Sequence, residues 1–213
     1  MAKSVVDQSG SWLEVRRIFP LIAGLLILAS IFLPFWSVSM SAPQYPEKDL
    51  TIRIFANKMV GDIWEFNALN QYAGVKFPDN IPEFKFLPAL LGGLAVFSIV
   101  TAFAPAEVKK KLLPLLFIIL LLFLLGAVAD LQWQLYQVGH NLDPNAPMLG
   151  IQPFTPPVIG KNKIANFTTL SLLRSGGISI GIAFILTSLA FLKRNSAVTV
   201  AEWGSKLWSK LDD

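Results

Sequence analysis

The stretch LLPLLFIILLLFLLGAVA, Leu112–Ala129, decides the fold of this 213-residue chain. None of its residues is charged, and a helix needs about 17–25 mostly apolar residues to cross the hydrocarbon core of a bilayer. Because lipid offers no hydrogen-bond partners to bare peptide groups, a span of this composition is expected to be helical. The stretch therefore predicts an integral membrane protein.

Three further apolar runs have a similar length, so the sequence predicts four transmembrane helices, at 18–38, 87–103, 112–129 and 172–192. Only 15% of the residues are charged and 54% are hydrophobic, whereas a soluble domain carries about 25% charged residues. The first run is longer than the apolar core of a signal peptide, which favours an uncleaved anchor. The expected fold class is an all-α membrane protein with four transmembrane helices and a small α+β extracytoplasmic cap.

Basic residues predict how the chain is oriented. Ten of the 18 lysines and arginines fall in three short segments, 1–17, 104–111 and 193–213. Such enrichment marks the cytoplasmic side, so both termini should be cytoplasmic and the protein should be a multi-pass protein of the cell inner membrane. The pI of about 9.4 then reflects topology, and we expect lipid and other membrane subunits as partners, with no nucleic acid.

The two ends of the chain have an amphipathic pattern. Segment 1–17 and the tail 193–213 are expected to lie at the membrane surface, with Trp12, Trp203 and Trp208 as interfacial anchors. The alternative is that the tail is a docking helix for a cytoplasmic partner.

Two long polar segments should face outward. Segment 39–86 predicts a short strand near 50–55 and a helix after Gly61, with Asp62 as its cap. The third span should continue as a helix to about residue 138, before a proline-rich loop at 139–171. Rigid backbone of this kind suits the docking of a partner, for which the candidate residues are Pro153, Phe154, Pro156, Pro157, Asn166 and Phe167.

The candidate ligands for a metal also lie in these outer segments. His140 is the only histidine, and Met40, Met59 and Met148 all fall outside the predicted spans. Imidazole and thioether together suit copper(I), although a lone histidine and packing methionines are the alternative reading. Asp143 either orients the imidazole or starts the turn at Pro144.

Catalysis is not expected from this composition. The chain has no cysteine, which excludes a thiolate metal site, a disulfide and a cysteine nucleophile. A single histidine leaves little for general acid–base chemistry, so we assign no catalytic residue and expect a protein that is not an enzyme.

Several motifs in the outer segments carry a resemblance to a known family. They are Ala42–Pro46, Gly61–Gly74, Gly139–Pro144, Pro156–Gly160 and Asn166–Phe167. Together they resemble a family of small bacterial multi-span membrane proteins associated with nitrous oxide reductase maturation and copper-enzyme assembly. The family often has a histidine where this chain has Gln71, so the resemblance implies fold and partners more directly than metal binding.

Two functional hypotheses follow from these observations. The first is a non-catalytic accessory or assembly protein that handles copper on the extracytoplasmic face for a membrane or periplasmic metalloenzyme. The alternative is a structural subunit of a larger respiratory or oxygenase complex that docks through its outer loops without binding metal. A transporter is disfavoured, because the apolar runs lack the interruptions that line substrate paths.

Overall fold

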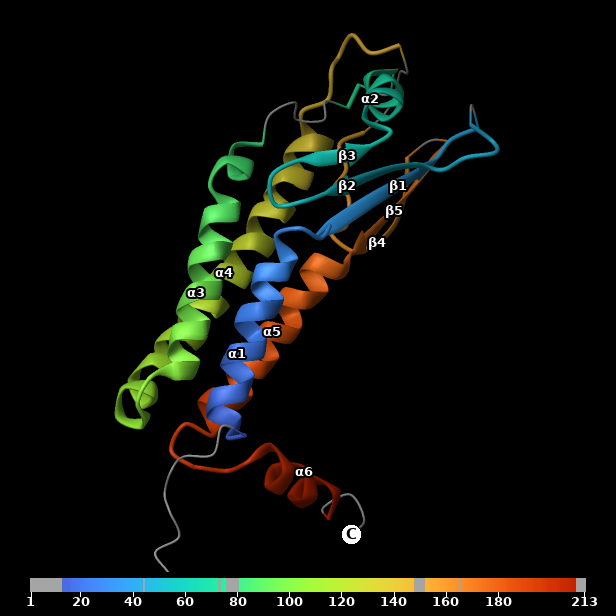
Figure 1. The fold of residues 1–213 in the computed structure, drawn as a ribbon. Helices are drawn as coiled ribbons and strands as arrows, with labels where there is room; N and C mark the ends of the chain where they lie inside the picture. The colour runs from blue at the N-terminus through green and yellow to red at the C-terminus, as the bar shows by residue number, and fades with distance from the viewer. Residues whose placement is uncertain are drawn as a thin grey trace, which may run out of the picture.

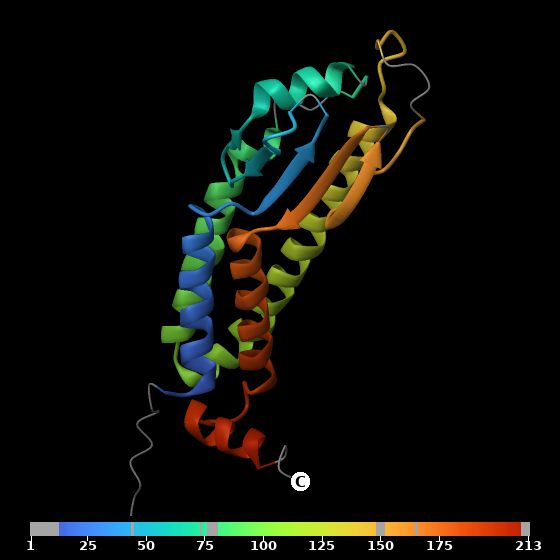
Figure 2. The same ribbon diagram turned by 90° about the vertical axis from the view of Figure 1, so that its right-hand side faces the viewer.

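The computed structural model describes residues 13–43, 45–72, 74–75, 81–147, 152–164 and 166–209. Within these residues a bundle of four helices carries a sheet at one end (Figure 1). The bundle consists of α1 (Val15–Ser30), α3 (Leu87–Phe103), α4 (Ala106–His140) and α5 (Ser175–Leu192). Two shorter helices lie at opposite ends of the molecule (Figures 1 and 2), α2 (Ile63–Tyr72) beyond the sheet and α6 (Val200–Trp208) below the bundle. A 3₁₀ turn, η1 (Pro82–Lys85), precedes α3.

The described fold is mixed α+β, so the prediction of an all-α protein is wrong. Five antiparallel strands form one sheet in the order β3-β2-β1-β5-β4. The strands are β1 (Trp36–Ser41), β2 (Leu50–Ile54), β3 (Met59–Gly61), β4 (Gly160–Ile164) and β5 (Phe167–Leu173). The sheet is therefore a main structural layer of the protein, and not a minor element of a small cap.

The prediction of four transmembrane helices is also wrong. Among the described residues, two helices are long and apolar enough to cross a membrane, α4 and α5. Helix α1 has 16 residues and is therefore about 24 Å long, which is shorter than the hydrocarbon core of about 30 Å. Helix α3, with 17 residues, is apolar but also shorter.

The error at 18–38 has a clear physical cause. Helix α1 ends at Ser30, and the chain enters β1 at Trp36. Pro34 disfavours helical backbone at the residue before it, and the sequence WSVSMS then alternates apolar and polar residues with the period of a strand. In the same way, the first residues of the run 172–192 belong to β5, and α5 begins only at Ser175.

The sheet and the bundle are joined where two helices become two strands. Helix α1 leads into β1, and β5 leads into α5. Helices α1 and α5 pack against each other, and strands β1 and β5 pair in the sheet (Figure 2). The amide of Gly176 donates to the carbonyl of Pro34 at 2.8 Å, and the amide of Arg174 donates to that of Phe35 at 2.9 Å. A Cβ atom on Gly176 would lie 2.8 Å from the carbonyl oxygen of Leu33, so this close approach requires glycine.

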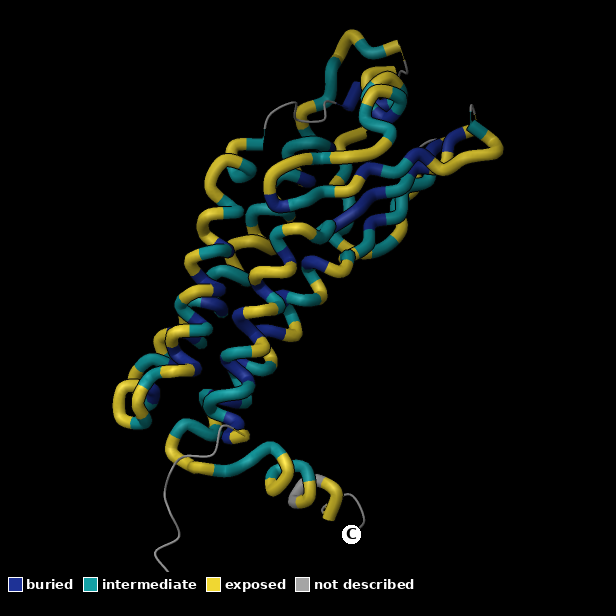
Figure 3. Tube along the Cα trace, viewed as in Figure 1, coloured by how far each residue is buried: buried dark blue, intermediate teal, exposed yellow. Residues whose placement is uncertain are grey.

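The bundle is apolar on its buried side and on its exposed side, and Figure 3 shows how buried and exposed residues alternate along its helices. Its core contains Ile27, Leu91, Leu116, Leu120 and Ile180. Its outer surface exposes further large apolar side chains, among them Leu25, Val96, Leu122 and Ile185. A helix that is hydrophobic on all sides is typical of a buried or membrane-embedded position, so this surface supports a membrane location.

In β1 and β2 the sheet has one apolar and one polar face. Trp36, Val38 and Ile52 are buried on the inner face, where they share a core with Phe66 of α2 and Leu135 of α4. On the other face, Ser39 and Thr51 share a hydroxyl hydrogen bond of 3.0 Å. Helix α4 therefore extends beyond its most apolar part to support the sheet.

A salt bridge ties α2 to the sheet. The carboxylate of Asp62, the predicted cap of α2, accepts hydrogen bonds from the Lys48 ammonium and from the amide of Thr51. These two donors hold the pKa of the Asp62 carboxyl below its usual value. Asp62 thus fixes α2 against β2.

Candidate functional site

His140 lies in the last turn of α4 and belongs to an aromatic stack. Its ring stacks on Tyr136 with centroids 3.8 Å apart, and Tyr136 stacks on Trp133 at 5.8 Å. The Nδ1 atom of His140 is 3.0 Å from the carbonyl oxygen of Tyr136. Because a carbonyl only accepts, Nδ1 is the donor, and in the neutral imidazole the lone pair is then on Nε2.

The sheet does not bring Met40 and Met59 together. Met59 pairs with Ile54, and Ile54 pairs with Trp36, which lies four residues before Met40 in β1. Four strand residues span about 13 Å, and β2 also separates the two strands. Met40 is buried in the sheet core and Met59 packs against the same core. Met148 lies outside the described residues.

No acidic or histidine cluster for a metal is present in the part of the chain that the structure describes, where no three His, Asp or Glu side chains converge. Asp143 makes turn contacts. Its carboxylate accepts from the amide of Asn145 at 2.9 Å, and its own amide donates to the carbonyl of Gly74 at 2.8 Å. Asp143 thus connects the end of α4 to the end of α2.

Most of the predicted docking residues face inward. Phe167 is buried in the sheet core, and Phe154 packs against that core. The backbone at Phe154 crosses α4 closely, since its amide donates to the carbonyl of Gly139 at 3.1 Å and a Cβ atom on Gly139 would overlap the Phe154 carbonyl. Pro156 and Pro157 are half-buried, whereas Pro153 and Asn166 are exposed. The loop at 152–158 therefore mainly packs against the core of the sheet.

The predicted interfacial anchors differ in their contacts. Trp203 of α6 packs edge-on against Phe19 of α1, with ring centroids 5.8 Å apart. Trp208 is exposed, and Trp12 lies outside the described residues.

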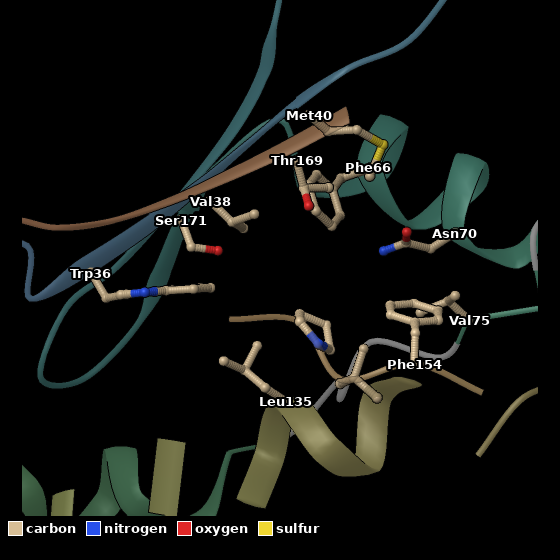
Figure 4. Close-up of a pocket in the computed structure, with 12 residues that line it drawn as sticks. Trp36, Val38, Met40, Phe66, Asn70, Val75, Leu135, Phe154, Thr169 and Ser171 are labelled. Atoms are coloured by element: carbon tan, nitrogen blue, oxygen red, sulfur yellow. The ribbon is translucent and has the colours of Figure 1, made fainter. Parts of the chain in front are cut away.

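A small cavity lies between the sheet, α2 and α4 (Figure 4). Its volume is about 50 Å³, well below the roughly 300–1,000 Å³ of a typical ligand pocket. The polar groups among its mainly apolar walls include Asn70, Thr169 and Ser171 (Figure 4). The lining residues are Trp36, Val38, Met40, Phe66, Asn70, Val75, Leu135, Val138, Phe154, Pro156, Thr169 and Ser171. None of them is a general acid or base near neutral pH, so the cavity suits a few waters or a small apolar group.

Trp36 closes this cavity on one side. Its indole Nε1 donates to the carbonyl of Val158 at 2.6 Å, which holds the proline-rich segment against the sheet. Met40, Phe154 and Pro156 were expected in other roles. The cavity itself was not predicted, because its lining comes from β1, α2 with the residues after it, α4, β5 and the loop at 152–158. The alternation of apolar and polar residues in WSVSMS is the one local pattern that could have placed Trp36 on the buried face of a strand.

Helix α2 presents an exposed aromatic stripe, which we define as Trp64, Ala68 and Tyr72. These residues are spaced four apart and lie on one side of the helix. Trp64 is 78% exposed and Tyr72 is 47% exposed, while Phe66 on the opposite side is buried. The helical spacing of Ile63, Phe66 and Leu69 predicts the inner side of this helix. The exposed stripe could have been inferred from it as the opposite side.

Comparisons with known proteins return no assignment. No protein-family model matches the chain, and no curated protein matches it significantly.

Replacing Trp36 by Phe tests how the cavity is closed. The substitution removes the indole donor and leaves the Val158 carbonyl without its partner, which should cost about 1–3 kcal/mol of unfolding free energy. Hydrogen exchange should accelerate over residues 152–158. Trp64→Phe is the matched control on an exposed site and should change stability by less than about 0.5 kcal/mol. Equal effects of the two substitutions would contradict the assigned role of Trp36.

Proposed function

We propose that this chain is a non-catalytic membrane accessory protein that acts by contact with a second membrane protein. In this proposal the bundle lies in the cell inner membrane, where α4 and α5 are the full-length spans and the shorter α1 and α3 pack beside them. Both termini are then cytoplasmic, and the sheet and α2 lie on the extracytoplasmic side. The partner is an extramembranous part of a metalloenzyme or of a respiratory or oxygenase complex. The exposed stripe on α2 is the observation that carries the proposal.

The chemistry of the stripe favours a protein partner. Trp and Tyr are enriched among the residues that dominate binding energy at protein interfaces, because each offers a large and rigid contact area together with a polar group. Trp64 is among the most exposed of the large apolar side chains in the described part of the chain. Burying its indole on a partner would remove this apolar surface from water.

The position of the stripe argues against lipid as its occupant. Helix α2 lies beyond the sheet, at the end of the molecule opposite to α6 (Figure 1). By contrast, Trp133 and Tyr136 follow the most apolar part of α4 within about two turns, where tryptophan and tyrosine belts lie at the membrane surface. The bilayer therefore accounts for these two aromatic residues but not for Trp64. A partner in the same membrane would meet α2 in a fixed orientation.

A photo-reactive amino acid at position 64, introduced in the native membrane, tests the docking proposal. It should give one discrete adduct with another membrane protein, identified by mass spectrometry. Tyr72→Ala should weaken that adduct several-fold because it removes half of the aromatic surface, without lowering the stability of the chain. The control is the same probe at Lys58, an exposed position in the turn between β2 and β3. Equal labelling from both positions, or none from position 64, rejects docking by α2.

Copper handling is a second candidate function, favoured by the geometry of His140. Its Nδ1 is engaged by the Tyr136 carbonyl, which directs the lone pair of Nε2 away from the helix backbone and leaves it available for a metal. Imidazole with thioether sulfur is a donor set that suits copper(I), and Met148 follows His140 closely in the sequence. The resemblance to copper-enzyme assembly proteins points in the same direction.

Titration of the purified protein with copper(I) under reducing conditions tests this second function. The expected result is one copper per chain, with a loss of binding of about tenfold or more in His140→Ala and in Met148→Leu. Met59→Leu is the control and should bind normally, because Met59 packs against the apolar core of the sheet. If His140→Ala binds copper as tightly as the original chain, the copper assignment fails and the docking proposal is unaffected.

A further inference from the structure

Lys109 is a buried cation at the end of the bundle opposite to the sheet. It lies in the first turn of α4 and is only 1% exposed. Its Nζ atom is buried without a hydrogen-bond partner among the described residues. A buried ammonium without a partner costs several kcal/mol, so a compensating group is expected beside it.

Three further charged residues surround this position. The Nε atom of Arg16 donates to Glu14 at 2.6 Å, and the Nε atom of Arg17 lies 3.7 Å from the same carboxylate oxygen. Both arginines and Lys109 interact electrostatically with Glu14. All four side chains are mostly buried. We call Glu14, Arg16, Arg17 and Lys109 the basic cluster.

The basic cluster has more positive than negative charge. Burial alone would raise the pKa of Glu14, but the hydrogen bond from Arg16 and the charges of Arg16, Arg17 and Lys109 outweigh it and hold this pKa below its usual value. Glu14 is therefore ionised at neutral pH. Among the described residues of the cluster, three cations therefore face one carboxylate, and the positive end of the α4 dipole adds to their charge.

Two other acidic residues of the described chain lie near this end. Glu107 accepts a hydrogen bond from Lys110 at 2.9 Å and also interacts electrostatically with Arg16, and the carboxylate of Glu202 accepts a hydrogen bond from the amide of Thr199 at 3.2 Å. Neither carboxylate is hydrogen-bonded to Lys109. Lys109 is therefore the cation of the basic cluster that lacks a hydrogen-bonded counter-charge among the described residues.

The surroundings place the cluster at the level expected for lipid headgroups. The amide of Val15 donates to the carbonyl of Val198 at 3.1 Å, and the amide of Val200 donates to that of Leu13 at 3.0 Å. These bonds hold α6 beside the start of α1 (Figure 2). Helix α6 is amphipathic and carries the exposed Trp208, which suits the membrane surface. If α4 and α5 cross the bilayer as proposed, phosphate groups lie at this height.

We propose that the basic cluster binds a phosphate group through Lys109 and the two arginines. Guanidinium groups offer paired N–H donors to phosphate oxygens, and the lysine ammonium adds three further donors. The source is either an anionic phospholipid headgroup or free phosphate, and the headgroup source rests on the membrane crossing of α4. The bound anion would compensate Lys109 and hold the starts of α1 and α4 together.

Thermal unfolding of the full chain in a neutral detergent tests the proposal, with three additions compared: phosphatidylglycerol, phosphatidylcholine and inorganic phosphate. Phosphatidylglycerol, but not phosphatidylcholine, should raise the unfolding temperature. Stabilisation by inorganic phosphate at similar occupancy would identify free phosphate as the source. In Lys109→Met the apparent affinity for the stabilising anion should fall about tenfold or more. Lys111→Met, which changes an exposed lysine of the same helix, is the control and should respond like the original chain.

Several outcomes would overturn the proposal. These are no stabilisation by either anion, equal stabilisation by the two lipids, or an unchanged response in Lys109→Met. Without added anion, Lys109→Met should be at least as stable as the original chain, because it removes an uncompensated buried charge. If this variant does not fold, Arg17→Gln at a more exposed position must weaken the anion response instead, and an unchanged response in Arg17→Gln rejects the site.

Discussion

The rest of the structure depends on two backbone hydrogen bonds that join helices to strands. Gly176 donates to Pro34 and Arg174 donates to Phe35, at the level where α1 becomes β1 and β5 becomes α5. Since the two chain segments remain paired on both sides of this junction, the direction of the sheet is fixed by the direction of the bundle. The Nε atom of Arg174 also donates to the hydroxyl of Ser37 at 2.6 Å. This hydrogen bond links the start of β1 to the residue that follows β5.

This junction explains where the candidate sites lie. It brings the inner face of β1 and β5 over the last turns of α4, so the cavity forms between them and Trp36 can reach the carbonyl of Val158. The remaining sheet then carries α2 to the far end of the molecule, where Trp64 is exposed. At the other end of the same helices, the bundle closes around Lys109. The contact surface and the basic cluster are therefore at opposite ends of one continuous structure.

Local patterns in the sequence account for part of this fold. The apolar run at 87–103 forms a helix over those residues, the β-branched segment near 50–55 forms β2, and the helix after Gly61 ends before Gly74. These elements depend on residues that are close in the chain. Gly74 adopts a positive φ of 76°, which is why it is a suitable stop.

The remaining features depend on distant partners. β1 follows an apolar helix directly, so its hydrophobic residues extended the predicted span. The alternation in WSVSMS is a short local signal, and pairing with β5, more than a hundred residues later, stabilises the strand. The cavity combines five separate segments in the same way. In the sequence, Lys109 was interpreted as one of the basic residues that mark the cytoplasmic side. Its burial depends on the packing of the start of α1 against the first turns of α4.

A disulfide across β1 and β5 tests the central pairing most directly. Ser39 and Leu170 are Cα partners, and directly paired antiparallel residues lie about 4.5–5.5 Å apart, within disulfide range. The chain has no cysteine, so in Ser39→Cys/Leu170→Cys any intramolecular bond must join these two sites. The account predicts rapid oxidation of this pair in membranes and little in Ser39→Cys/Leu172→Cys, whose residues are diagonal neighbours about 7–8 Å apart. Equal oxidation of both pairs, or preferential oxidation of the diagonal pair, would contradict it.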